Sequence, residues 1–97
     1  MLKEVLAQNP ADAFARYGLA LEYSNVGAVD QSLEEFGKLI SAHPDYTAGY
    51  FMAAQTLAKA QRTNEARKML EDGISSAQRT NNAHAQSEME AMLADLQ

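Results

Sequence analysis

Residues 13–46 read AFARYGLALEYSNVGAVDQSLEEFGKLISAHPDY, and residues 47–80 read TAGYFMAAQTLAKAQRTNEARKMLEDGISSAQRT. The two segments align without a gap, and apolar or small residues in one copy face apolar or small residues in the other. A fixed period of this length is typical of arrays in which each repeat is one hairpin of helices. The sequence therefore predicts two consecutive helical hairpins. The matched pairs include Leu19 with Ala53, Ala20 with Ala54, Tyr23 with Leu57, Phe36 with Leu70 and Leu39 with Gly73.

The residue types outside this alignment also favour helix. The chain has only two prolines, helix-forming residues dominate, and no stretch alternates Val, Ile and Thr as a strand would. Asn9, Asp30 and Asn64 each precede or begin a helical stretch, and we expect their side-chain oxygens to cap it. The expected helices cover residues 1–8, 10–25, 30–42, 45–60, 64–78 and 82–96.

The spacing resembles the tetratricopeptide repeat (TPR), whose signature places Trp, Leu-Gly, Tyr, Ala, Phe and Pro at fixed offsets. Two columns depart from it, because Arg16 stands in the Trp column and Gln78 replaces the closing proline. The resemblance implies an all-α, short TPR-like helical-hairpin solenoid, similar to small stand-alone bacterial proteins of this family. The signature columns hold Arg16, Leu19, Ala20, Tyr23, Ser32, Phe36 and Pro44 in the first copy, and Tyr50, Ala53, Ala54, Leu57, Ala66, Leu70 and Gln78 in the second.

With 97 residues, the chain is expected to form one domain. Residues 1–9 would form a helix in the register of the second half of a missing repeat. Residues 13–46 and 47–80 are the two repeats, and residues 82–97 form an amphipathic capping helix.

Two points stay open at this stage. Phe14, Tyr17-Gly18 and Leu21 imitate the signature two residues early, and that register would place them in the core. Gly73 lies within a helix, where glycine is unfavourable. Either a close approach of the last helix or a frayed helix end would explain it.

Composition excludes several classes of function. The formal net charge of −5 argues against a nucleic-acid partner. The cations Lys59, Arg62, Arg67 and Lys68 are expected to form a solvated edge. The absence of cysteine excludes disulfides and thiolate metal sites. No apolar stretch is long enough for a membrane span and the first residues are not a secretory signal, so a cytoplasmic location is expected.

Nothing in the sequence indicates an enzyme. The glycines are scattered, and no nucleophile motif or phosphate-binding loop is present. His84 and Glu88 lie one helical turn apart, but two ligands are too few for a metal site, so a surface pair is expected. We expect no catalytic residue, no bound metal and no cofactor.

The family resemblance implies that the first helices of successive repeats line a concave face that binds ligands. Most residues carried onto that face are apolar, and the columns used to clamp a terminal carboxylate hold no cation. Ala85, Gln86 and Met89 of the capping helix are expected to extend this face. The expected groove residues are Phe14, Tyr17, Leu21, Phe51, Met52, Gln55 and Lys59.

Two functions follow from these expectations. The first is a non-enzymatic scaffold whose groove binds an apolar or amphipathic peptide or helix of another protein. The alternative is self-association, in which a second copy of the chain uses the same apolar surface or the open N-terminal end.

Overall fold

The structure is a computed structural model that describes residues 1–96 as helices joined by short turns. No β-strand occurs within these residues, so the all-α prediction is confirmed. None of the described helices is long and apolar enough to cross a membrane. The helices are α1 (Leu2–Gln8), α2 (Ala13–Asn25), α3 (Val29–Ala42), α4 (Thr47–Lys59), α5 (Thr63–Arg79) and α6 (Ala83–Asp95).

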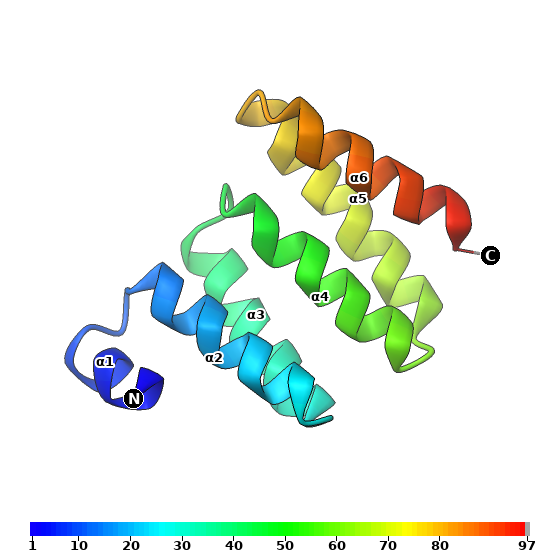
Figure 1. Ribbon diagram of the computed structural model, residues 1–97. Coiled ribbons are helices and arrows are strands. Elements are labelled where there is room, and N and C mark those ends of the chain that lie inside the picture. Colours follow the sequence, from blue (N-terminus) through cyan, green and yellow to red (C-terminus); the bar gives the residue numbers. More distant parts are fainter. Residues whose placement is uncertain (97) are drawn as a thin grey trace.

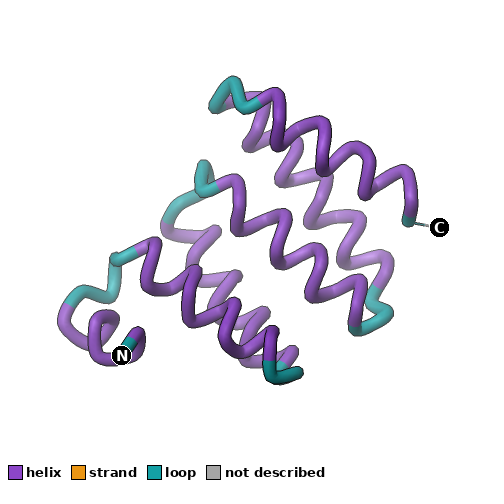
Figure 2. Tube along the Cα trace, in the orientation of Figure 1, coloured by secondary structure: helices purple, strands orange, loops and turns teal. Residues whose placement is uncertain are grey.

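The helices form two layers (Figure 1). Helices α2, α4 and α6 lie side by side in the front layer, and α3 and α5 lie behind them. Short turns at the layer ends connect each helix to the next (Figure 2). The pairs α2–α3 and α4–α5 are the predicted hairpins, with α1 packed on α2 and α6 closing the other end. We call the two exposed surfaces the α2–α4–α6 face and the α3–α5 face.

Small residues allow the helices of each hairpin to approach closely. Ala20 and Ala54 are completely buried, as the repeat columns predicted. The large side chains of Phe36, Leu39 and Leu70 are equally buried and fill the space between neighbouring helices. The repeat columns therefore form the core.

The burial pattern also decides between the two registers. Leu19 and Ala20 are buried, whereas Phe14 is 75% exposed. In the alternative register Phe14 would be a core residue, so that register is wrong.

Helix α2 starts later than expected. The carboxylate of Asp12 accepts a hydrogen bond from the Ala15 N–H at 2.9 Å and caps the helix. Asn9 is not the cap of α2, because it is the residue that ends α1 and donates its N–H to the Val5 carbonyl. Pro10 and Ala11 form a turn between the two helices, so α2 begins after this turn and Asp12, not Asn9, precedes its first residue.

The expected caps of the second helix in each hairpin are also wrong. Ala28 and Arg62 flank the N-termini of α3 and α5, so Asp30 and Asn64 lie inside the first helical turn. Ala28 and Arg62 each donate the backbone N–H to a carbonyl in the last turn of the preceding helix. The N-cap residues Ala28 and Arg62 have no side-chain oxygen that could accept a hydrogen bond, so α3 and α5 begin without a side-chain cap.

Helix α5 is longer than its counterpart α3. Proline ends a helix at or before the preceding residue, and α3 ends at Ala42, ahead of Pro44. Gln78 occupies the corresponding position in α5 and allows the helix to continue to Arg79. Helix α6 consequently starts at Ala83, two residues later than the repeat spacing from Thr47 would place it.

The delayed start of α6 changes which residues it buries. Met89, expected on the groove, is completely buried. A Cβ added at Gly73 would lie 2.5 Å from the Met89 Sδ and 2.6 Å from the Tyr50 Cβ. The close approach of α4 and α6 therefore explains Gly73, and the frayed-end explanation is excluded.

Candidate protein-binding face

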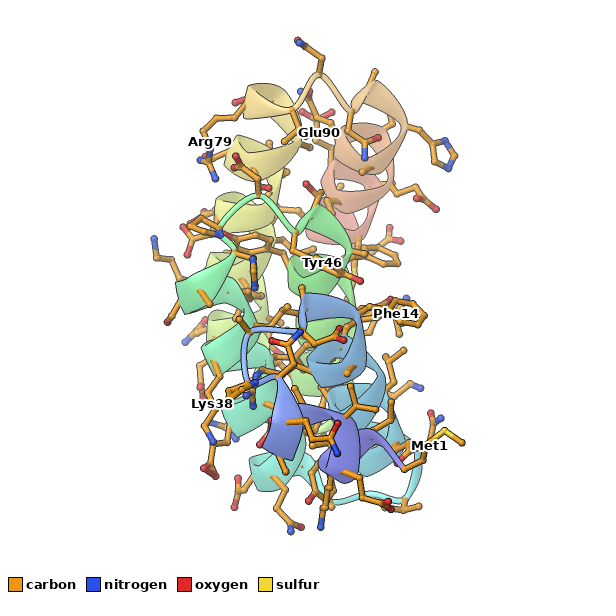
Figure 3. All side chains as sticks on the ribbon, turned by 90° about the vertical axis from the view of Figure 1, so that its left-hand side faces the viewer. Met1, Phe14, Lys38, Tyr46, Arg79 and Glu90 are labelled. Atoms are coloured by element: carbon orange, nitrogen blue, oxygen red, sulfur yellow. The ribbon has the colours of Figure 1, made fainter. Side chains whose placement is uncertain are left out.

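Phe14 is the most exposed of the apolar groove residues, at 75%. It lies in the first turn of α2 and points away from the helices, on the side opposite Lys38 of α3 (Figure 3). Nothing in the fold requires a phenylalanine in such an exposed position. Phe14 therefore contributes apolar surface to the α2–α4–α6 face.

Tyr17 lies one turn further along α2 and is half-buried. Its ring meets the Phe36 ring edge-on, with 6.4 Å between centroids, and lies 5.3 Å from the Tyr46 ring. Burial raises the pKa of the Tyr17 hydroxyl and that of Tyr46. Tyr17 thus helps to join the two repeats, and only part of it is available to a ligand.

Leu21 and Met52 pack, half-buried, on the same core cluster as Tyr17. They form an apolar floor between α2 and α4. Met52 reaches this cluster because α4 is in contact with α2. The structure therefore brings Tyr17, Leu21 and Met52 together.

Phe51 lies further toward α6. It is half-buried against the core cluster that includes Ala54 and Met89. Beside it is a hollow of about 220 Å³ between the N-terminal parts of α4 and α6. The residues that line this hollow are Thr47, Ala48, Phe51, Asn82, His84, Ala85 and Glu88.

Lys59 lines a second hollow, of about 280 Å³, where α2 and α4 end. The hydroxyls of Ser24 and Thr56, 2.9 Å apart, join the two helices there. Lys59 is exposed and forms no ion pair with any residue that the structure describes. Gln55 is half-buried and lines neither hollow. The expected residues therefore occupy two hollows at opposite ends of α4, with an apolar floor beside α2.

Sequence reasoning missed the polar residues around these hollows. Ser24 and Thr56 are not separated by the repeat period, so no sequence signal joins them. His84 and Glu88, expected as a surface pair, lie 3.3 Å apart and exposed beside the hollow at Phe51. Their position there depends on the delayed start of α6.

The remaining charged side chains mostly neutralise one another. Arg62 pairs with Glu65 at 2.7 Å and lies 3.5 Å from Asp30, and Lys68 pairs with Asp72 at 2.9 Å. The hydrogen bond from Arg62 holds the pKa of Glu65 below its usual value. Within residues 1–96, no group of three or more His, Cys, Asp or Glu side chains could hold a metal ion.

Known proteins share this architecture. No protein-family model matches the sequence. A TPR repeat-containing protein of Pseudomonas aeruginosa is 26% identical over 95 residues, which cover 98% of this chain and 90% of that protein. The solution structure of a tetratricopeptide repeat domain protein from Salinibacter ruber matches with a TM-score of 0.85 and 26% identity, over 92% of this chain and 90% of that one.

A solution structure of a Bordetella parapertussis protein matches with a TM-score of 0.84 and 23% identity. The match covers 98% of this chain and 83% of that one, and at this identity it supports the fold alone. The resemblance to tetratricopeptide-repeat proteins and the predicted solenoid fold are confirmed.

Proposed function

We propose that this tetratricopeptide-repeat fold is a non-enzymatic scaffold whose α2–α4–α6 face binds an amphipathic helix or peptide of another protein. Folds of this type generally mediate protein–protein interaction through the surfaces that their stacked repeats create. The specific proposal concerns which face is used and what chemistry it recognises.

The observation that carries the proposal is the exposure of Phe14 beside an apolar floor. Phe14 is 75% exposed, whereas the adjacent Tyr17, Leu21 and Met52 are each half-buried. Complete burial of a phenylalanine side chain contributes about 1.5–3 kcal/mol. A ligand that covers Phe14 would gain part of this energy and would extend contacts already begun by the floor.

The two hollows indicate the chemistry of the ligand. Phe51 forms part of the wall of one hollow, at one end of α4, and a ligand can place an apolar side chain against its ring. The hollow at the other end contains Lys59, which favours a carboxylate. A ligand with one apolar face and an acidic residue toward one end would match both.

A library of random peptides displayed on phage tests this proposal. We expect peptides selected on the wild-type protein to carry apolar residues three or four positions apart. Phe14→Ser should weaken their binding by at least about tenfold, the equivalent of about 1.4 kcal/mol. Val5→Ser is the control, because Val5 is also an exposed apolar residue, at 37%, but lies on α1, outside the α2–α4–α6 face.

Phe14→Ser is a better test than a change at Tyr17, because Tyr17 contacts Phe36 and its removal would also weaken the core. The proposal is wrong if selected peptides bind Phe14→Ser as tightly as wild type. Equal losses in Phe14→Ser and Val5→Ser would also contradict it, because the binding would not depend on this face.

Self-association through the same face is the alternative function. The molar mass of the protein in solution distinguishes it from peptide binding. A wild-type oligomer that becomes monomeric in Phe14→Ser would assign the α2–α4–α6 face to a second copy of the chain.

A further inference from the structure

The α3–α5 face, opposite the proposed ligand face, carries a groove of about 430 Å³. Leu33 on α3, Leu57 on α4 and Met69 on α5 supply its apolar lining. Gly37 lies at its edge, and the polar side chains that complete the lining come from α5. This apolar groove has no counterpart among the expected groove residues.

No contact among residues 1–96 explains why position 37 is a glycine. A Cβ at Gly49 would meet Leu39 Cδ2 at 2.9 Å, and one at Gly73 would meet Met89 and Tyr50. A Cβ at Gly37 would have no atom of the described residues within 4 Å, although Gly37 lies in the middle of α3. Glycine inside a helix is unfavourable unless a close approach requires it. The surface of α3 at Gly37 is therefore open, and a helix from outside the chain can approach its backbone closely there.

The charges beside Gly37 are self-complementary. Glu34 and Lys38 lie one turn apart on α3, with side chains 64% and 54% exposed, and their charged atoms are 3.8 Å apart. If two copies of α3 cross antiparallel between these residues, each Glu34 lies opposite the other copy's Lys38. A parallel crossing would instead place like charges together, which is unfavourable.

We propose that a second copy of this chain docks on the α3–α5 face, with the two α3 helices crossing antiparallel at Gly37. The missing side chain at Gly37 allows the two helix backbones to approach closely. The Glu34 and Lys38 pairs fix the antiparallel direction, and the half-buried Leu33 and Met69 side chains of the grooves are covered in the contact.

The size of the face is compatible with a weak, specific dimer. Specific interfaces bury about 600–1,000 Å² on each partner, and weak ones fall at or below the lower limit. The molecule extends 39 × 29 × 17 Å, so its broad faces are large enough for this contact. We expect a weak dimer, with a Kd on the order of 10 µM to 1 mM.

Light scattering behind size exclusion, over this concentration range, tests the proposal. The wild type should pass from monomer to dimer. Gly37→Gln should weaken the dimer by at least about tenfold, because the new side chain blocks the crossing point. Gly37→Gln adds a good helix former at an uncrowded site, so its melting temperature should not fall and unfolding cannot account for the loss. A wild type that stays monomeric throughout overturns the proposal.

The charge pattern gives a second, independent test. Glu34→Lys and Lys38→Glu, each alone, should weaken the dimer because like charges then face each other. An equimolar mixture of the two variants should restore it, because one copy is then positive at both positions and the other copy is negative at both. The antiparallel crossing is wrong if the single variants dimerise as well as wild type, or if the mixture fails to dimerise.

Phe14→Ser separates this proposal from the proposed ligand face. It should leave the dimer unchanged, because Phe14 lies on the opposite side of the molecule from Lys38 (Figure 3). A dimer that is lost in Phe14→Ser but retained in Gly37→Gln would overturn the assignment to the α3–α5 face and leave the apolar α2–α4–α6 face as the interface.

Discussion

Gly37 and Gly73 both lie inside helices, but Gly73 is crowded by neighbouring helices and Gly37 is not. At Gly73 the backbone is in contact with α4 and α6, whereas the surface above Gly37 is open. We expect Gly73→Ala to lower the free energy of unfolding by about 1–3 kcal/mol, because Met89 can move but the Tyr50 Cβ cannot. Denaturant unfolding monitored by circular dichroism measures this change.

Gly37→Ala is the matched control for Gly73→Ala. It should raise the free energy of unfolding by up to about 1 kcal/mol, because alanine favours the helix and meets no neighbour. The measurement belongs at low protein concentration, where self-association does not contribute. A Gly73→Ala protein as stable as wild type would mean that α6 does not pack against this residue.

The tyrosines predict a loss of stability in alkali. Burial raises the pKa of Tyr17, Tyr46 and Tyr50, and for Tyr50 the hydrogen bond and charge of Arg79 act in the opposite direction. In the unfolded chain these hydroxyls ionise near pH 10, at about their ordinary pKa. The folded state therefore holds more protons above this pH, and the free energy of unfolding falls as the pH rises further.

Denaturant unfolding at a series of pH values, with the ultraviolet absorbance of tyrosinate, checks this prediction. Tyr46→Phe should reduce the slope of stability against pH, because one of the three ionising groups is removed. Stability that stays constant while the tyrosines ionise would contradict the prediction.

At the scale of the single helix, the start of α2 depends on one carboxylate. Asp12→Ala should lower the free energy of unfolding by about 1 kcal/mol, because the Ala15 N–H loses its acceptor. Asn9→Ala should have almost no effect, because no hydrogen bond of the Asn9 side chain is present in residues 1–96. Equal losses in the two variants would favour the helix start at Asn9 that the sequence alone suggested.

The helices themselves were predictable, and their exact starts were not. The repeat period and residue types placed each helix to within about three residues. The caps at Asp30 and Asn64 were predicted wrongly, because a polar residue near a helix start is the expected sign of a cap. The N-cap positions are instead Ala28 and Arg62, two residues earlier, whose side chains carry no oxygen that would mark a cap in the sequence.

At the scale of the whole molecule, the helices differ in how many neighbours support them. Among the described helices, α4 packs against α2, α3, α5 and α6, whereas α1 packs against α2 alone. Local opening costs least where few contacts are lost. We therefore expect amide hydrogen exchange to be slowest in α4 and α5 and fastest in α1.

Nuclear magnetic resonance of the native protein measures this gradient residue by residue. Leu6→Ala should accelerate exchange in α1, where Leu6 is the buried residue, and leave α5 unchanged. Equal exchange in all helices would indicate one cooperative unit that includes α1.

Part of the candidate face, like the fold, could be predicted from the repeat spacing. The repeat spacing placed Phe14 and Phe51 on first helices, and both lie on the α2–α4–α6 face. It could not foresee that Tyr46, in the turn before α4, would bury part of Tyr17. It also could not place Met89, because the longer α5 changed the position of α6. The groove beside Gly37 depends on how α3 and α5 lie relative to each other, which no single repeat determines.

The packing of each helix against close neighbours in the sequence has a consequence for how the chain is made. Each contact among the described helices joins two helices that are consecutive in the chain or separated by a single helix. Such local contacts close short loops and favour rapid folding. On the ribosome, the α2–α3 hairpin can form before α5 has been translated. Met89, on α6, packs against Tyr50 and Gly73 only later, once α6 has emerged from the exit tunnel.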